Sequence, residues 1–294
     1  MVTGATGFIG AHLARRLAEH GAEVHAVSRC APEEPARYRW HQADLRDADQ
    51  TAEVVSSARP DLVFHLASQV TGARDVKLVV PMLKSNLLSA VNLMAAAADT
   101  PQARVVLAGS IEEPRRGDPT PSSPYAVAKW AATSYARLFH VLWGVRVTVL
   151  RVAMVYGPGQ RDTTKLVPYT ALSLLRGHRP RVSSGTRLVD WVYVDDVVDA
   201  FLAAVTPPGA DHAIGKSIDI GSGTAVSIRE VTELLAEFAG SPLRPRYGAI
   251  PDRPLDFARI ADLTLATELL GWRPAIGLEE GLRRTVRWYA TNGR

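Results

Sequence analysis

The sequence contains a single cysteine, Cys30, among its 294 residues. One thiol excludes an internal disulfide and a zinc site built from cysteines, and we expect no other metal site. No apolar run approaches the roughly 20 residues that a membrane span needs. Residues 1–4 show no basic segment followed by an apolar one, so a secretory leader is not supported. These absences lead us to expect a cytoplasmic protein.

The sequence also lacks a large excess of either charge, because 34 Lys and Arg residues stand against 30 Asp and Glu residues and the formal net charge is only +4. Proteins that bind nucleic acid more often show a basic stripe with interleaved aromatics. The arginines here are scattered, apart from short pairs such as Arg115-Arg116 and Arg283-Arg284. We interpret the charge as an ordinary solvated surface, which is compatible with attraction of an anionic cofactor and substrate. Neither nucleic acid nor a membrane is expected as a partner.

The first half of the chain alternates short apolar runs with helical patterns, which is typical of a parallel sheet with crossover helices. Strands are expected at residues 23–27, 62–66, 105–108 and 145–150, and helices at residues 8–20, 47–57, 79–98 and 124–142. Only Met1 and Val2 remain for an opening strand, so either that strand is very short or the numbering begins inside the native chain. The last two helices are apolar on more than one face, which favours packing on the sheet and against a second subunit in a homodimer.

Glycines recur at a spacing of three in the segment Thr3-Gly4-Ala5-Thr6-Gly7-Phe8-Ile9-Gly10. Between a strand and a helix, such a turn lets backbone N–H groups approach a pyrophosphate at the helix N-terminus. The spacing differs from the G-x-G-x-x-G fingerprint, but the context is the same. The turn therefore predicts a dinucleotide site that contains Gly4, Thr6, Gly7, Phe8, Ile9 and Gly10.

The end of the second strand offers Ser28 and Arg29. A site selective for NAD usually has an acidic residue there, for the ribose hydroxyl. A hydroxyl and a guanidinium suit a 2′-phosphate instead, which favours NADP (NADPH) and leaves NAD as the alternative. Asp44 and Leu45, after the third strand, are expected near the adenine.

A helix is predicted to begin at Ser123-Pro124, because serine is a good cap and proline a good first residue. Tyr125 and Lys129 are then at i and i+4, on one face. A free phenol has a pKa of about 10, and a nearby ammonium and the helix N-terminus should favour the phenolate. Tyr125 is therefore predicted to exchange a proton with a substrate oxygen while a nicotinamide moves hydride.

Six segments, in this order, resemble the extended short-chain dehydrogenase/reductases: TGATGFIG at 3–10, HLASQV at 65–70, YAVAK at 125–129, LRVAMVYGPGQ at 150–160, WVYVDDV at 191–197 and LGWRP at 270–274. That family includes nucleoside-diphosphate-sugar epimerases, dehydratases and 4-ketoreductases. The resemblance implies an α/β fold with a Rossmann-type doubly wound parallel sheet. It implies an NAD(P)-binding domain over 1–155, with returns near 192–220, and a smaller C-terminal part over 156–294 that mainly binds a nucleoside-diphosphate sugar.

The resemblance also implies roles for single residues. Ser110 would hold the reacting sugar oxygen, Tyr125 would be the acid/base, and Lys129 would bind the nicotinamide ribose. Arg253 would meet the substrate diphosphate. The remaining residues of the cofactor site would be Leu66, Ala67, Ser68 and Asn86. His65 is expected to be a packed strand residue.

The chain departs from the family pattern in the substrate half. Met154 stands where an asparagine is usual, and Val189 where an arginine is usual. Arg187, two residues earlier, is the expected replacement for that arginine if the loop bends. The interval from Ser110 to Tyr125 is also short for the family, which indicates a trimmed loop or missing residues.

Several reactions fit these motifs. Ile111 removes the aspartate of the dTDP-glucose dehydratase pair, whereas Glu112 matches the glutamate that GDP-mannose dehydratases keep, so Glu112 is a further catalytic candidate. The string around Ser110 also resembles reductases, and NADPH would favour a net reduction. We therefore expect reduction of a nucleotide-activated 4-keto-(6-deoxy)hexose. The alternatives are a 4-epimerase or a 4,6-dehydratase that recycles bound NAD, and a non-catalytic dinucleotide sensor, which would not need the Tyr–Lys pair.

Overall fold

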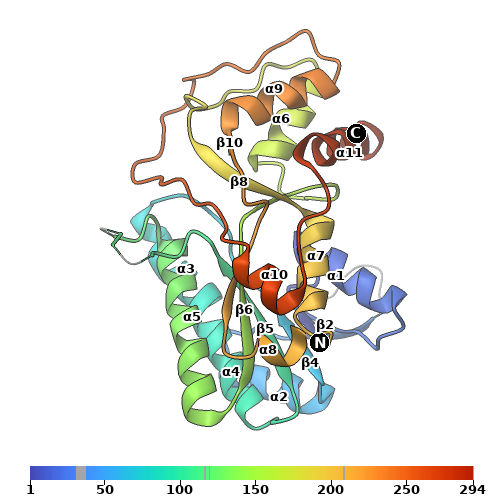
Figure 1. Ribbon diagram of the computed structural model, residues 1–294, viewed down its shortest axis with the longest axis vertical. Helices are drawn as coiled ribbons and strands as arrows, with labels where there is room; N and C mark the ends of the chain where they lie inside the picture. Colours follow the sequence, from blue (N-terminus) through green and yellow to red (C-terminus); the bar gives the residue numbers. More distant parts are fainter. Residues whose placement is uncertain (31–37, 116, 119, 208, 294) are drawn as a thin grey trace. The chain divides into compact units, whose positions relative to one another are not determined.

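The computed structural model describes residues 1–30, 38–115, 117–118, 120–207 and 209–293 (Figure 1). The chain forms two compact units. Unit 1 comprises Met1–Val152, Val198–Asp219 and Thr264–Trp272, and unit 2 comprises Ala153–Val197, Ile220–Leu263 and Arg273–Arg294. Each unit is described here by itself.

Unit 1 is built on a seven-stranded sheet with the order β3-β2-β1-β4-β5-β6-β9. Its strands are β1 (Val2–Thr3), β2 (His25–Ser28), β3 (Arg39–Gln42), β4 (Leu62–His65), β5 (Arg104–Ser110), β6 (Arg146–Val152) and β9 (Ser217–Ile220). The pairings from β3 through to β6 are parallel. Because the strand order reverses between β1 and β4, the carboxyl ends of these strands form the crevice where doubly wound sheets bind ligands. The predicted fold class is confirmed.

The opening strand β1 has two residues in the structure. Val2 pairs with Ala26 on one side and with Phe64 on the other. The N-terminal ammonium of Met1 donates a hydrogen bond of 2.6 Å to the carbonyl of Leu62. Two residues therefore suffice for a central strand, because neighbours on both sides satisfy the backbone.

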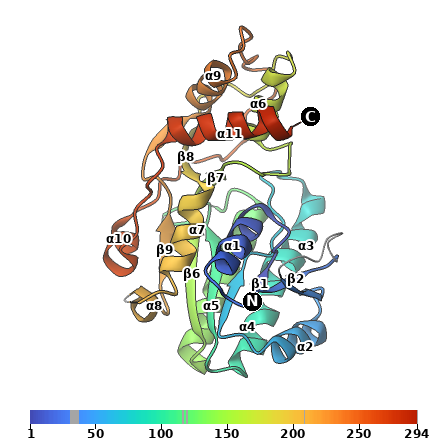
Figure 2. The same cartoon turned by 90° about the vertical axis from the view of Figure 1, so that its right-hand side faces the viewer.

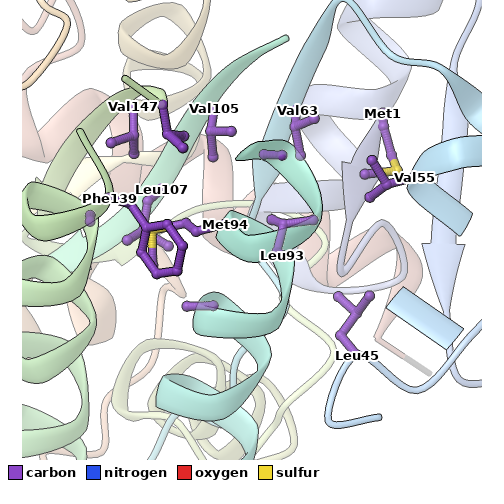
Figure 3. Close-up of a cluster of buried hydrophobic side chains, with 14 of the residues drawn as sticks. Met1, Leu45, Val55, Val63, Leu93, Met94, Val105, Leu107, Phe139 and Val147 are labelled. Atoms are coloured by element: carbon purple, nitrogen blue, oxygen red, sulfur yellow. The ribbon is translucent and has the colours of Figure 1, made fainter. Parts of the chain in front are cut away.

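Helices cover both faces of this sheet (Figures 1 and 2). The helices of unit 1 outside the 76–98 segment are α1 (Phe8–Glu19), α2 (Ala48–Ala58), α5 (Pro124–Trp143), α8 (Gly209–His212) and α10 (Thr264–Leu270), together with part of α7 (Val194–Ala203). Figure 3 shows one face, where Leu93, Met94 and Phe139 pack against strand residues such as Val63 and Val105. On β4, Phe64 points the other way and meets Phe201 of α7, as strand alternation requires. Near that face, Arg16 of α1 pairs with Asp199 at 2.9 Å.

The segment Val76–Ala98 corrects the expectation that no apolar stretch approaches the length of a membrane span. It consists of η1 (Val76–Leu78), α3 (Val79–Met82), the π-helical turn η2 (Leu83–Leu88) and α4 (Ser89–Ala98). Among the described residues, this one helical segment is long and apolar enough to cross a membrane by length and composition. Its second half supplies Ala90, Leu93, Met94 and Ala97 to the core of unit 1, which gives its apolar composition a role inside the fold.

Unit 2 has a three-stranded sheet with the order β10-β8-β7, formed by β7 (Met154–Tyr156), β8 (Leu188–Tyr193) and β10 (Ala225–Ser227). Its helices include α6 (Leu166–Leu175), α9 (Ile228–Phe238) and α11 (Leu278–Asn292). These helices and strands enclose a second apolar core around Trp191, Leu235 and Leu282. Ser227 caps α9 by accepting a hydrogen bond from the amide of Glu230 at 3.1 Å, which explains why this helix begins at Ile228.

Candidate active site

The glycine turn lies between β1 and α1, as predicted. Gly4 has a φ of +67°, and a Cβ at Gly4 would lie 2.7 Å from the amide nitrogen of Ala67. A Cβ at Gly10 would lie 2.2 Å from the carbonyl oxygen of Gly4. Gly7 is the N-cap of α1 and has no side-chain cap, so the helix N-terminus presents backbone N–H groups suited to an anion. The turn has the close packing and the open helix end that a dinucleotide pyrophosphate needs.

The turn is joined to the segment that follows β4. The hydroxyl oxygen of Thr3 accepts hydrogen bonds of 3.2 Å from the amides of Leu66 and Ala67, and lies 2.9 Å from Nδ1 of His65. His65 is buried, and burial lowers its pKa to about 3. Its position is that of a packed, neutral strand residue. The carboxyl ends of β1 and β4 therefore form one hydrogen-bonded unit.

Asn86 belongs to the π-helical turn and is 1% exposed. Its Oδ1 accepts hydrogen bonds from the amide of Gln69 at 2.7 Å and from the hydroxyl of Ser68 at 3.1 Å. Its Nδ2 donates to the carbonyl of Gln69 at 2.9 Å. Asn86 thus holds the segment after β4 in place, and π turns recur at functional sites. The prediction that Asn86 binds the cofactor directly remains a prediction.

At the end of β2, Ser28 donates a hydrogen bond to the carbonyl of Cys30, and Arg29 is exposed. The side chain of Asp44 is hydrogen-bonded by Arg46, and this bond is the largest cause that lowers the pKa of Asp44. Residues 31–37, which follow this strand, lie outside the described residues.

Leu45 packs in the core of unit 1, where Figure 3 shows it. Its carbonyl accepts a hydrogen bond of 3.0 Å from Nδ2 of Asn92. Leu45 could therefore contact an adenine only through the small part of its surface that is exposed.

The predicted acid/base group is brought together in unit 1. Ser123 caps α5 by accepting a hydrogen bond from the amide of Ala126 at 3.1 Å, and Pro124 opens the helix, as the sequence predicted. The side chain of Tyr125 is hydrogen-bonded to Ser110, the last residue of β5. Nζ of Lys129 lies 5.9 Å from the centre of the Tyr125 ring and donates to the carbonyl of Ala108 at 2.8 Å.

The ionisation of these groups differs from the expectation. Burial raises the pKa of Tyr125 above its ordinary range, the carboxylate of Glu112 adds to the rise, and the hydrogen bond from Ser110 opposes it. The direction is opposite to the expected one, since burial is the largest cause and favours the neutral form of Tyr125. Burial also lowers the pKa of Lys129 to about 8.

Two further carboxylates lie at the carboxyl ends of the strands and were missed by sequence reasoning. Glu113 follows β5 and is 3% exposed. Asp219, at the end of unit 1 in β9, is equally buried and pairs with Arg151 at 2.7 Å and with Arg115 at 3.2 Å. Glu113 stands in the string around Ser110 that resembles reductases, which gives it no role of its own, and Asp219 belongs to no periodic pattern or motif. Among the described residues, no group of three or more His, Cys, Asp or Glu side chains could hold a metal ion.

The predicted substrate residues lie in unit 2. Arg187 pairs with Asp256 at 3.2 Å, and both side chains are mostly buried. Arg253 is exposed. Val189 faces the core of unit 2 and Met154 packs against that core. The ion pair gives Arg187 a carboxylate partner 69 positions away in the sequence, which no local pattern predicts.

Comparison with known proteins was made for the whole chain. Residues 1–221 match the model of the NAD dependent epimerase/dehydratase family. The UDP-glucose 4-epimerase of Mycolicibacterium smegmatis is 32% identical over 98% of this chain and 97% of its own. A dTDP-glucose 4,6-dehydratase of Streptomyces griseus is 31% identical over 98% and 93%. The dTDP-6-deoxy-L-talose 4-dehydrogenase (NAD(P)(+)) of Kitasatospora kifunensis is 32% identical over 96% and 92%.

Solved structures agree with these relatives. The UDP-glucose 4-epimerase of Thermotoga maritima, determined with UDP-glucose, has a TM-score of 0.89 at 30% identity and covers 100% of this chain and 99% of its own. The UDP-glucose 4-epimerase of Thermus thermophilus, in complex with NAD, has a TM-score of 0.84 at 29% identity and covers 99% and 98%.

Proposed function

Because this chain belongs to the NAD dependent epimerase/dehydratase family, we propose that it is a 4-epimerase of a nucleoside-diphosphate sugar that works with bound NAD. The observation that carries the proposal is the Ser110–Tyr125–Lys129 group beside an intact glycine turn, in a chain similar over nearly its full length to UDP-glucose 4-epimerases. This choice replaces the 4-ketoreductase that the sequence favoured. The similarity to the dTDP-6-deoxy-L-talose 4-dehydrogenase supports that earlier reading.

The cofactor site supports a dinucleotide. Gly4 and Gly10 leave no room for side chains, and the uncapped N-terminus of α1 supplies donors for a pyrophosphate. We propose NAD as the resident cofactor, since a similar structure holds NAD and since a reaction that regenerates its cofactor needs no exchange with NADPH. The earlier expectation of NADP rested on Ser28 and Arg29. The hydroxyl of Ser28 donates a hydrogen bond to the carbonyl of Cys30, and the similar solved structures with a named cofactor hold NAD.

The chain's own residues then divide the work. NAD held at the glycine turn would supply the hydride acceptor and donor for C4 of the sugar. Tyr125, which is hydrogen-bonded to Ser110, would exchange the proton of the C4 hydroxyl, as base in its phenolate form and as acid in its phenol form. Ser110 would hold the C4 oxygen. Lys129, fixed by the Ala108 carbonyl, would place its positive charge beside the ring of Tyr125 and hold the nicotinamide ribose.

Dehydration is the second candidate, because Glu112 lies close enough to Tyr125 to raise its pKa and because dTDP-glucose 4,6-dehydratases are similar to this chain. A carboxylate there could remove a proton next to the ketone. Against it stands the neighbouring Ile111, a buried apolar side chain where the dehydratase pair has its acid. Arg187 and Arg253 are proposed to bind the nucleoside diphosphate from unit 2.

The test uses the purified chain, first without added cofactor and then, in a separate arm, with a 4-keto sugar and added NADPH. Acid-released nucleotide is identified first, and UDP-glucose and dTDP-glucose are then supplied separately. Appearance of the C4 epimer supports epimerisation, and loss of one water from dTDP-glucose supports dehydration. Turnover that occurs only with a 4-keto sugar and consumes added NADPH would establish the reductase instead.

Replacing the acid/base gives the matched mutational test. Tyr125→Phe should retain NAD and lose about 10³-fold in turnover, the size of a general acid/base contribution. Tyr135→Phe, on the same helix but exposed, is the control and should behave as wild type. Near-normal turnover in Tyr125→Phe would refute the assignment.

A further inference from the structure

Glu113 closes the turn that carries Ser110. The amide of Glu113 donates to the carbonyl of Ser110 at 3.1 Å. In return, Oε1 of Glu113 accepts a hydrogen bond of 2.8 Å from the amide of Ser110. The two residues therefore fix each other at the end of β5. The carboxylate, not another backbone group, satisfies the buried N–H of Ser110.

Gly109 makes room for this arrangement. A Cβ at Gly109 would lie 2.7 Å from Oε1 of Glu113 and 2.9 Å from Cγ1 of Val149. The carboxylate thus lies across the backbone of β5, at a place that any other residue would fill. Burying a carboxylate is costly unless it is paired and hydrogen-bonded, so the charges around it matter.

Positive groups face Glu113 from two elements. Lys129 approaches from α5 and Arg151 from β6, and both favour the ionised carboxylate, as do the Ser110 amide and Thr133 of α5. Burial acts in the opposite direction and is the largest effect, so the pKa of Glu113 is raised. A cavity of about 230 Å³ borders Glu113, Arg151 and Lys216, and is large enough for water to reach the carboxylate.

Among the groups around Lys129, Glu113 is the one whose charge opposes the effect of burial. His65 faces Lys129 from β4 and is neutral, because burial lowers its pKa to about 3. Burial favours the neutral form of Tyr125, one helical turn earlier. Against the burial that lowers the pKa of Lys129 to about 8, the one opposing group is Glu113. Glu112 and Glu113 both act on Tyr125, but only Glu113 acts on Lys129.

From this geometry we infer that Glu113 is a positioning residue for the reaction, because it fixes Ser110 through the backbone and holds a buried carboxylate whose charge acts on Lys129. The inference rests on the proposed function of the Ser110–Tyr125–Lys129 group. Glu113 touches neither the sugar nor the reacting atoms in this role. Its two effects can be separated by substitution, since glutamine can accept the Ser110 hydrogen bond but carries no charge.

Kinetics provide the first test. Glu113→Gln should fold, retain NAD and keep turnover at mildly acidic pH, but the alkaline limb of its kcat profile should move to lower pH by about one unit, the effect of losing one neighbouring charge. Glu113→Ala loses the hydrogen bond as well and should show turnover about tenfold or more below that of Glu113→Gln. Glu53→Gln, exposed on α2, is the control and should change neither quantity.

The second test does not depend on activity. The sequence has only five lysines, so carbon-13 labelling at Cε allows each to be titrated by NMR, with Lys129 assigned from Lys129→Arg. In Glu113→Gln, the midpoint of Lys129 should fall by a similar amount, and the other four should not move. An unmoved midpoint, or a Glu113→Gln protein that does not fold, overturns the inference. A shifted midpoint in a protein inactive on every sugar nucleotide would instead reject the proposed function alone.

Discussion

Asn86 is the residue whose replacement should separate the cofactor segment from the rest of the fold. Its side chain makes three hydrogen bonds to Ser68 and Gln69, at 2.7, 2.9 and 3.1 Å, from a position that is 1% exposed. Asn86→Ala removes all three. At about 1 kcal/mol for each net hydrogen bond, the free energy of unfolding should fall by about 3 kcal/mol. In a protein of this size, that corresponds to a drop in Tm of roughly 5 °C.

The assay is thermal unfolding followed by circular dichroism, together with measurement of the NAD retained after gel filtration. Asn92→Ala is the matched control, because Asn92 lies on the same helical segment and makes one side-chain hydrogen bond, to the carbonyl of Leu45 at 3.0 Å. It should lose about 1 kcal/mol and keep its NAD. Equal stability losses in the two variants, or full NAD retention in Asn86→Ala, would refute the role given to Asn86.

Three further predictions concern unit 1. Gly10→Ala should abolish NAD retention, because its Cβ would lie 2.2 Å from the Gly4 carbonyl oxygen; a variant with normal NAD content contradicts the account of the turn. An apolar stripe is exposed on α5 at Val127, Trp130, Leu138 and Val141, and a stripe of this kind predicts a partner surface. We expect a homodimer that Leu138→Glu with Val141→Glu converts to a monomer in light scattering, and a wild-type monomer would reject it. Burial lowers the pKa of Lys129 to about 8, below that of an unfolded lysine at about 10.4. The folded protein then binds fewer protons between these values, so the stability of wild type relative to Lys129→Met should rise with pH across that window. A flat difference would contradict a buried lysine.

The elements predicted from sequence are those whose signals are local. The helix that carries Tyr125 was located by Ser123 and Pro124, and in the structure these two residues cap and open it. The glycine turn was located by spacing alone, and Gly4 shows why, since its positive φ and its contact with Ala67 exclude a side chain.

What the sequence could not supply depends on contacts between distant residues. In the π-helical turn at 83–88, Asn86 is hydrogen-bonded to Ser68 and Gln69, which lie 18 and 17 positions earlier in the sequence. Glu113 stands in a loop without periodicity, so nothing local indicates that it is buried. The expectation of a phenolate at Tyr125 counted the charges near the phenol but not the desolvation, which only the packed structure reveals.

Burial pushes the two groups of the acid/base pair toward their neutral forms, and residues 110–113 act on both pKa values, although Glu112 and Glu113 add to the rise at Tyr125. Ser110 opposes the rise in the pKa of Tyr125, and Glu113 opposes the fall in the pKa of Lys129. Because these two residues bond to each other through Oε1 of Glu113, a change in the turn must act on both groups at once. Substitutions in the turn 110–113 should therefore alter the pH dependence of turnover. Substitutions on α5 at positions other than Tyr125 and Lys129 should instead act on stability or association.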